Sequence, residues 1–202
     1  MCGIAGEIEY ERPLSPAGAA AMQAALRRRG PDQEGIFSSP HALLVHTRLC
    51  VIDPENGMQP MQARQRGRTC TLIYNGELYN TPELRAALLA AGWQFDGHSD
   101  TEVLLKAYLE WGEACVGRFN GIFAFAVWEQ EADTLFLARD RMGVKPLFFT
   151  RTDSGGLLFA SELKALLAHP SVTAELDAGG VGELILLGPG RTPGCGVFRN
   201  IS

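Results

Sequence analysis

Residues 121–140 read GIFAFAVWEQEADTLFLARD, and this stretch indicates the fold class most directly. Two runs rich in aliphatic and aromatic residues, 122–128 and 134–140, are separated by a short polar segment, which is typical of two strands joined by a hairpin. Two further runs follow at 147–150 and 157–161, with Asp153-Ser154-Gly155-Gly156 between them. Because short glycine-containing turns join antiparallel strands, we interpret the whole region as antiparallel sheet.

The rest of the chain alternates groups of strands with groups of helices. Ser15 and Pro16 are a typical N-cap and first helical residue, and Gly30-Pro31 ends that helix. Because strands group apart from helices, we predict an α+β fold of antiparallel sheets covered by helices, not a βαβ fold. The further strands are expected at 4–10, 35–38, 42–46 and 69–74, with a polar loop at 64–68, and the helices at 15–28, 82–91, 101–111, 162–167 and 178–187.

Composition and charge exclude several functional classes. The 202 residues are 46% hydrophobic and 20% charged with a net charge of -5, as expected for a single globular domain with no excess positive charge to bind nucleic acid. The basic run Arg27 to Arg29 is interpreted as the cationic end of a helix. No run approaches the ~20 apolar residues of a membrane span, and no signal peptide is recognisable. We therefore expect a cytoplasmic protein with no membrane or nucleic-acid partner.

The cysteines and histidines do not suggest a metal centre. The five cysteines include no C-x-x-C pair, and their odd number argues against a disulfide framework. The four histidines lack the i, i+4 spacing of a helical metal site. We predict no structural metal, and we expect Cys50 and Cys70, which lie in apolar runs, to be core residues.

Cys2 directly follows the initiator methionine. Methionine aminopeptidase removes Met1 before a small residue, so we expect Cys2 to carry a free α-amine. An amine with a pKa near ~8 can take the proton of a thiol with a pKa near ~8.5, while Gly3 and Gly6 allow close backbone approach. The alternative is that Cys2 is an ordinary small residue beside a turn or strand end.

Three polar groupings accompany this cysteine. Arg48 ends a predicted strand, and its planar fork suits a carboxylate. Asn75 and Gly76 follow an apolar strand and offer two neutral donors for an oxyanion. Glu77 and Asp100, the latter at a helix start, could hold an ammonium group. Each grouping also has a structural interpretation as a turn, cap or solvated side chain, but together they match an α-amino acid with a distal amide, which is glutamine.

Several motifs, taken together, resemble the N-terminal glutaminase domain of glutamine-hydrolysing asparagine synthetases. That domain is a class II glutamine amidotransferase, so the resemblance implies the N-terminal nucleophile hydrolase fold, a four-layer αββα sandwich of two antiparallel sheets flanked by helices. The motifs are residues 1–6, 29–32, 48–53, 74–79, 99–100, 121–126, 139–140, 143, 146–147 and 160–164.

The resemblance also implies a role for each candidate residue. Cys2 would attack the glutamine amide with its own amine as general base, and Asn75 with the Gly76 N–H would hold the oxyanion. Arg48 would bind the substrate carboxylate, and Glu77 and Asp100 its ammonium group. The segment that lines the pocket would comprise Leu49, Cys50, Val51 and Ile52. No cofactor is implied in this domain.

The expected organisation is a glutaminase domain at 1–187 and a Pro/Gly-rich connection at 188–202. The connection would lead to an ATP-dependent synthetase domain that binds ATP and Mg²⁺ and uses the ammonia to make asparagine from aspartate. We expect either a fragment or a stand-alone glutaminase with a separate synthetase, and a homodimer is left open. Two alternatives remain: an acceptor other than aspartate, such as a cell-wall peptide, natural product or lasso peptide, and a non-catalytic domain if Met1 is retained.

Overall fold

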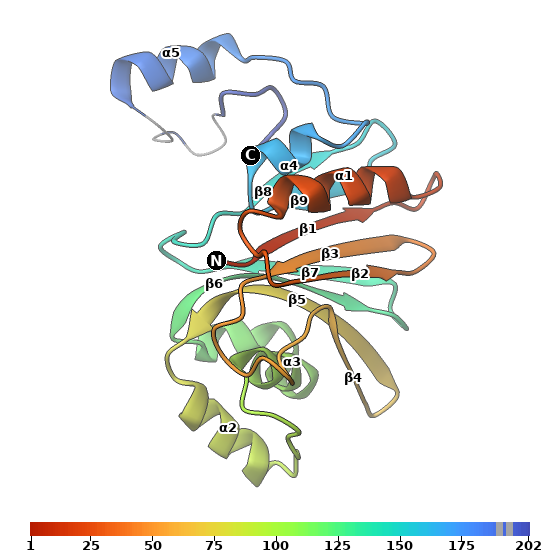
Figure 1. Cartoon of the computed structure of the whole chain (residues 1–202), viewed down its shortest axis with the longest axis vertical. Coiled ribbons are helices and arrows are strands. Elements are labelled where there is room, and N and C mark those ends of the chain that lie inside the picture. Colours follow the sequence, from red (N-terminus) through yellow and green to blue (C-terminus); the bar gives the residue numbers. More distant parts are fainter. Residues whose placement is uncertain (189–191, 193–195) are drawn as a thin grey trace.

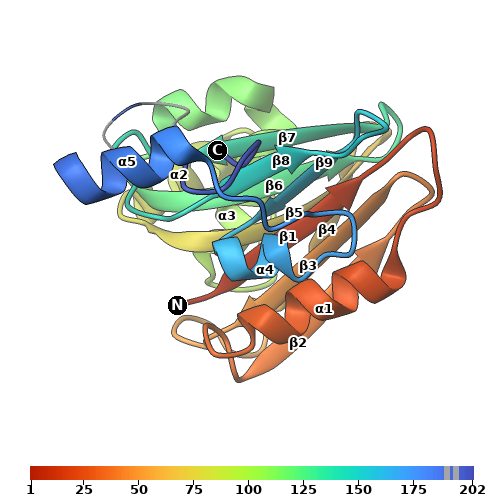
Figure 2. The same ribbon diagram turned by 90° about the horizontal axis from the view of Figure 1, so that it is seen from above.

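Two antiparallel sheets lie face to face between layers of helices in the computed structural model, which describes residues 1–188, 192 and 196–202 (Figures 1 and 2). The first sheet has the order β2-β3-β1-β9-β8 and the second the order β4-β5-β6-β7. The predicted four-layer αββα sandwich is therefore confirmed. The strands are β1 (Gly3–Ile8), β2 (Gln33–Ser38), β3 (Ala42–Arg48), β4 (Met61–Gln65), β5 (Arg68–Leu78), β6 (Gly121–Glu129), β7 (Thr134–Arg139), β8 (Phe148–Arg151) and β9 (Leu157–Ala160).

Helices cover the outer face of each sheet (Figure 1). The first sheet packs against α1 (Pro16–Leu26) and α4 (Leu163–Leu167), and the second against α2 (Thr81–Ala90), α3 (Asp100–Trp111) and the 3-10 helix η1 (Gly112–Arg118). The helix α5 (Ala178–Leu187) lies beyond the first helical layer. Apolar side chains of both sheets, including those of Ile4, Ile73, Trp128 and Phe159, fill the space between the sheets. Burial of both faces explains why β1 and β3 are apolar throughout most of their length.

The central strand β1 determines where Cys2 lies. One edge of β1 pairs with β3, where Gly3 is opposite Thr47, and the other edge pairs with β9, where Ala5 is opposite Ala160. The start of the strand is further held by Ser161, whose Oγ accepts from the Ile4 N–H at 3.0 Å. Cys2 therefore directly precedes a strand that is hydrogen-bonded on both edges.

The local sequence signals for the first helix and the last hairpin are confirmed. Ser15 Oγ accepts from the Gly18 N–H at 3.0 Å, which satisfies one of the free donors at the start of α1. The hairpin between β8 and β9 is closed by a hydrogen bond from Thr152 N–H to the Gly156 carbonyl, and Gly155 has a φ of 85°. A positive φ is the reason a glycine is favoured at this turn position.

Three local predictions are wrong. The predicted polar loop at 64–68 belongs to a hairpin in which β4 and β5 are joined at Arg66 and Gly67, both with positive φ. Strand β5 does not end at residue 74 but continues to Leu78, so Asn75, Gly76 and Glu77 are strand residues. Cys50 is half-buried outside the core, since its N–H donates to Asp32 Oδ2 at 2.7 Å in a surface loop; Cys70 is buried as expected.

The described part of the predicted connection packs back on the domain. Phe198 forms an isolated antiparallel bridge with Leu176, and Ile201 is buried against the first helical layer. Ser202 and Phe149 exchange two backbone hydrogen bonds of 3.0 and 2.8 Å. Residues 189–191 and 193–195, which contain much of the Pro/Gly-rich sequence and Cys195, lie outside the described residues.

Candidate active site

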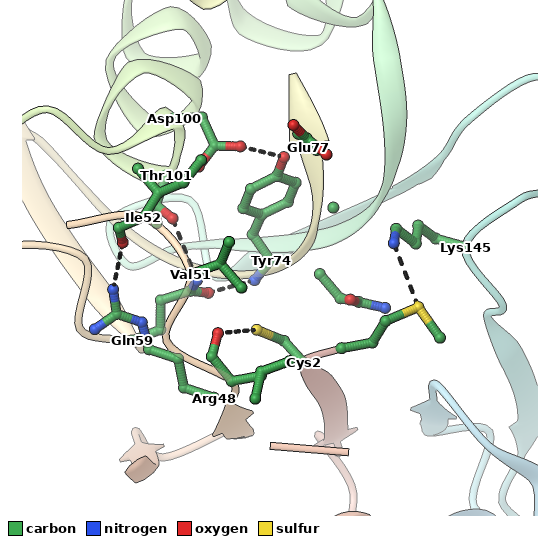
Figure 3. A pocket seen from close by; sticks show the side chains of 14 residues that line it. Cys2, Arg48, Val51, Ile52, Gln59, Tyr74, Glu77, Asp100, Thr101 and Lys145 are labelled. Carbon is green, nitrogen blue, oxygen red and sulfur yellow. Dashed lines mark hydrogen bonds between the residues drawn. The ribbon is translucent and has the colours of Figure 1, made fainter. Parts of the chain in front are cut away.

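A cavity of about 230 Å³ opens where the N-terminal end of β1 meets the ends of β3 and β5 (Figure 3). Nine of the ten predicted site residues line it: Cys2, Arg48, Leu49, Val51, Ile52, Asn75, Gly76, Glu77 and Asp100. Cys50 does not, because its backbone turns toward Asp32. The structure adds five lining residues that were not predicted from the sequence to line the site: Met1, Gln59, Tyr74, Thr101 and Lys145.

The Cys2 thiol lies half-buried at this cavity and donates to the Leu49 carbonyl at 3.7 Å. Burial raises the pKa of the thiol above its usual value, and the Leu49 contact, the N-terminal charge and the Arg48 charge offset this only in part. The thiol is therefore held mainly in its protonated form near neutral pH. A nearby base would be needed to make it a nucleophile.

Asn75 is buried and lies beside the backbone of Cys2. In the amide orientation that satisfies both of its polar atoms, Nδ2 donates to the Cys2 carbonyl at 3.2 Å and Oδ1 accepts from Arg29 at 3.3 Å. An amide nitrogen carries two hydrogens, so one N–H of Asn75 remains for a group in the cavity.

Arg29 lies shortly after the end of α1, where the sequence placed the basic run, and its side chain also reaches the site. Its Nε donates to the Cys2 carbonyl at 2.8 Å, and its Nη1 pairs with Glu162 at 3.0 Å. Arg29 therefore contacts both Cys2 and Asn75 and sets their relative position.

The N–H of Gly76 points toward the cavity. Successive N–H groups of an antiparallel strand alternate between its two edges. The Tyr74 N–H donates to Gln59 Oε1 at 2.6 Å and the Leu78 N–H to Asp100 Oδ2 at 3.2 Å, both away from β6, so the Gly76 N–H between them faces the same way. That edge is open because β4 begins only at Met61, opposite Leu72, and does not extend alongside Gly76.

A glycine is required at position 76 by close packing. A Cβ atom there would lie 2.5 Å from the Ile122 carbonyl oxygen and 2.5 Å from Tyr74 Cε2. Neither neighbour can move freely, since Ile122 belongs to the adjacent strand β6 and Tyr74 is buried. The absence of a side chain thus lets β5 and β6 pair tightly at the cavity.

The buried guanidinium of Arg48 is engaged with the loop that follows β3. Its Nη1 donates to Gln33 Oε1 at 2.7 Å and to the Pro54 carbonyl at 3.0 Å, and its Nη2 donates to the carbonyls of Ile52 and Asp53 at 2.9 and 2.7 Å. These bonds use the four N–H groups of the two terminal nitrogens, which leaves Nε–H. In this state Arg48 organises the loop and is not an open fork for a carboxylate.

Asp100 and Glu77 differ in their surroundings. Asp100 is buried at the start of α3, where its Oδ2 accepts from the Tyr74 hydroxyl at 2.8 Å and from the Leu78 N–H (Figure 3). Burial raises the pKa of Asp100, although these donors favour the charged form. Glu77 is exposed at the cavity rim. A cation between the two would meet one desolvated and one hydrated carboxyl group.

Asp53 closes the loop against the segment that precedes α3. Its Oδ1 accepts from the Asn56 N–H at 3.0 Å and its Oδ2 from the His98 N–H at 2.6 Å. Asp53 has a φ of 46°, and its backbone carbonyl also accepts from Arg48. The loop at residues 49–57 is therefore hydrogen-bonded both to Arg48 at the end of β3 and to the segment that precedes α3.

The fold and this cavity define the class of protein: the chain has the N-terminal nucleophile hydrolase sandwich with a cysteine at position 2. It matches the family model described as a glutamine amidotransferase domain over residues 1–202. The chain belongs to this family, and its sequence is similar to part of several glutamine-hydrolysing asparagine synthetases.

The similar proteins support this placement. The chain is 50% identical over 203 residues to asparagine synthetase [glutamine-hydrolyzing] 3 of Bacillus subtilis (strain 168), covering 100% of this chain and 33% of that protein. It is 36% identical over 181 residues to asparagine synthetase B of Escherichia coli (strain K12), covering 89% of this chain and 32% of that protein. The chain thus spans about a third of the length of these curated relatives.

The solved structures show the same fold at low identity. Glutamine phosphoribosylpyrophosphate amidotransferase from B. subtilis superposes with a TM-score of 0.68 at 21% identity, covering 88% of this chain and 46% of that one. Within the described part of the present chain, no helix has the length and apolar composition to cross a bilayer. In the same residues, no three His, Cys, Asp or Glu side chains are grouped to hold a metal ion.

Proposed function

We propose that this domain hydrolyses glutamine to glutamate and ammonia through a glutamyl thioester on Cys2. The observation that carries the proposal is the meeting of the Cys2 thiol, the Asn75 amide and the edge of β5 at Gly76 in one cavity. Cys2 directly precedes β1, and the other two groups lie on β5, which belongs to the other sheet. A nucleophile and two oxyanion donors at one point are the requirements of acyl transfer.

The proposed reaction begins after Met1 is removed. The free α-amine of Cys2 takes the thiol proton, and the sulfur attacks the side-chain amide carbon of glutamine. The negative oxygen is held by the remaining Asn75 N–H and the Gly76 N–H. The amine then gives its proton to the departing nitrogen, ammonia leaves, and the thioester remains. Water, deprotonated by the same amine, attacks the thioester and releases glutamate and the thiol.

The two ends of the cavity would hold the amino acid part of glutamine. Asp100 and Glu77 would bind the α-ammonium group. Arg48 would contribute Nε–H to the carboxylate or exchange some of its loop carbonyls for it, with Leu49, Val51 and Ile52 lining the wall. Cys50 would act only through its place in the loop.

We further propose that the ammonia serves ATP-dependent asparagine synthesis from aspartate. The support is the similarity to glutamine-hydrolysing asparagine synthetases, of which this chain matches about a third. A synthetase domain, in the same or a separate chain, would be the partner and would bind ATP and Mg²⁺. Asparagine formation from glutamine, aspartate and ATP by the protein that contains this domain tests the acceptor. If a different compound is amidated instead, that compound and not aspartate is the acceptor.

The test of the glutaminase is glutamate release by the processed domain and by Cys2→Ala. Alanine at position 2 also permits removal of Met1, which intact mass verifies for both proteins. Cys115→Ala is the matched control, because Cys115 is buried in η1 outside the cavity. We expect Cys2→Ala to be inactive and Cys115→Ala to be active. Glutamate release by Cys2→Ala would overturn the proposal.

A further inference from the structure

The loop between β7 and β8 places Lys145 at the cavity through its backbone. Asp140 accepts from the Lys145 N–H at 3.0 Å, and Arg139 Nε donates to the Lys145 carbonyl at 2.8 Å. Asp140 also accepts from the Phe123 N–H at 3.2 Å and donates its own N–H to the Phe123 carbonyl at 2.8 Å. Phe123 lies opposite Gly76. The contacts through Asp140 and Phe123 therefore fix the backbone of Lys145 relative to β5, the strand that carries the proposed oxyanion donor.

The side chain of Lys145 points into the cavity. With Met1 in place it is only 9% exposed, and its Nζ lies 3.5 Å from the sulfur of Met1 (Figure 3). Among residues 1–188, 192 and 196–202, no carboxylate forms an ion pair with it. Lysine is rarely buried this far without an anion. The position suggests that this cation acts on a group in the cavity.

Met1 is bonded to the nitrogen of Cys2, the proposed base. Met1 Sδ is separated from that nitrogen by five bonds, which span roughly 6 Å when extended. Figure 3 shows Lys145 on one side of the cavity and Asp100 on another, with Cys2 and Tyr74 between them. Lys145 therefore lies on the side of the nucleophile to which Met1 is attached, opposite Asp100.

We propose that Lys145 is a positioning residue that keeps the α-amine of processed Cys2 unprotonated, so that this amine can accept the thiol proton. The inference rests on the proposed glutaminase function. A nearby cation disfavours the ammonium form of the amine, and only the neutral form has a lone pair for the thiol proton. The same cation also favours the thiolate that results.

Other charged groups face Cys2 and must be weighed. Arg48 from β3 and Arg29 after α1 act in the same direction as Lys145, although Arg29 is paired with Glu162. Glu77 and Asp100 act in the opposite direction. The α-ammonium group of bound glutamine would neutralise these carboxyl groups, which leaves the cations dominant in the substrate complex. The Cys50 thiol and the Tyr74 hydroxyl are also titratable groups close to Cys2.

The first test is the pH dependence of kcat/KM for glutamine hydrolysis, which reports the ionisation of the free enzyme. Lys145→Met removes the charge at similar length, and Lys145→Arg keeps it. We expect the acidic limb of Lys145→Met to move up by roughly one pH unit, the order of magnitude for one charge within the same partly wet cavity. Lys145→Arg should stay near the wild type. Arg141→Met is the control, since Arg141 is exposed in the same loop.

The second test needs no substrate. Iodoacetamide reacts with the thiolate, which the same cation would favour, so the rate of Cys2 alkylation, followed by the mass of the Cys2 peptide against pH, should shift in the same direction in Lys145→Met and not in Arg141→Met. An unshifted acidic limb in both assays, or an effect on KM alone, would overturn the inference while leaving the glutaminase intact. Activity of Cys2→Ala would instead refute the proposed function.

Discussion

Replacing Asn75 by alanine should separate the proposed catalytic role of this side chain from its structural role. The change removes the Nδ2 contact to the Cys2 carbonyl and the Oδ1 contact to Arg29. The Cys2 carbonyl keeps its 2.8 Å bond from Arg29 Nε, so no buried acceptor is orphaned, and we expect a stability loss of about 1–2 kcal/mol. If Asn75 also holds the oxyanion, kcat should fall ~10²- to 10³-fold, or about 3–4 kcal/mol of transition-state stabilisation.

Asn80→Ala is the matched control for this experiment. The Asn80 side chain also makes two hydrogen bonds, to the Arg118 carbonyl and from the Asn120 N–H, both at 2.9 Å, but it lies outside the cavity. Denaturant unfolding should give similar losses for the two variants, while steady-state glutaminase kinetics should show a fall in kcat only for Asn75→Ala. Equal kcat values in the two variants, or a loss confined to KM, would refute the assignment of Asn75 to the oxyanion.

Three further predictions concern the walls of the cavity. Arg48→Lys cannot keep the four contacts of the guanidinium fork, so KM for glutamine should rise and hydrogen exchange in residues 49–57 should accelerate even without substrate; unchanged exchange would contradict the loop role. Gly76→Ala places a Cβ 2.5 Å from the Ile122 carbonyl oxygen, which should cost about 1–3 kcal/mol of unfolding free energy, measured in urea; a variant as stable as the wild type would show that β5 relaxes freely. Burial lowers the pKa of His46 to about 4, below its unfolded value of ~6.5, so the unfolded chain binds more protons in this window and stability should fall by up to about 3 kcal/mol as pH drops from 6.5 to 4. His46→Gln should lack that part of the slope, and an unchanged slope would place its origin elsewhere.

The sequence predicted the layers of the fold because the signals for them are local. Apolar runs, the Ser15 cap and the glycine turn before β9 each act within a few residues. Strand β4 was missed because MQARQ has neither β-branched residues nor strong apolar alternation. The continuation of β5 was missed because Asn75-Gly76 has the composition of a turn, and only the close packing of Gly76 against β6 shows why a strand tolerates it.

The sequence predicted which residue types form the candidate site, but not which hydrogen bonds those residues make. Cys2, Asn75 and Asp100 could be selected because thiol, amide and carboxyl groups suit one substrate. The Gln33 and loop-carbonyl partners of Arg48 depend on how the chain folds back after β3. Lys145 could not be found at all, because nothing in its neighbouring sequence indicates that a loop 144 residues away returns to the N-terminus.

The pairing of β1 along both of its edges has a practical consequence for work with this protein. Since β1 pairs with β3 from Gly3 and with β9 from Ala5, and Met1 lines the cavity, a purification tag added ahead of Met1 would start at the opening that we propose admits glutamine. Recombinant preparations should therefore carry their tag elsewhere, and an inactive sample with an extended amino end would say nothing about the chemistry of the natural protein.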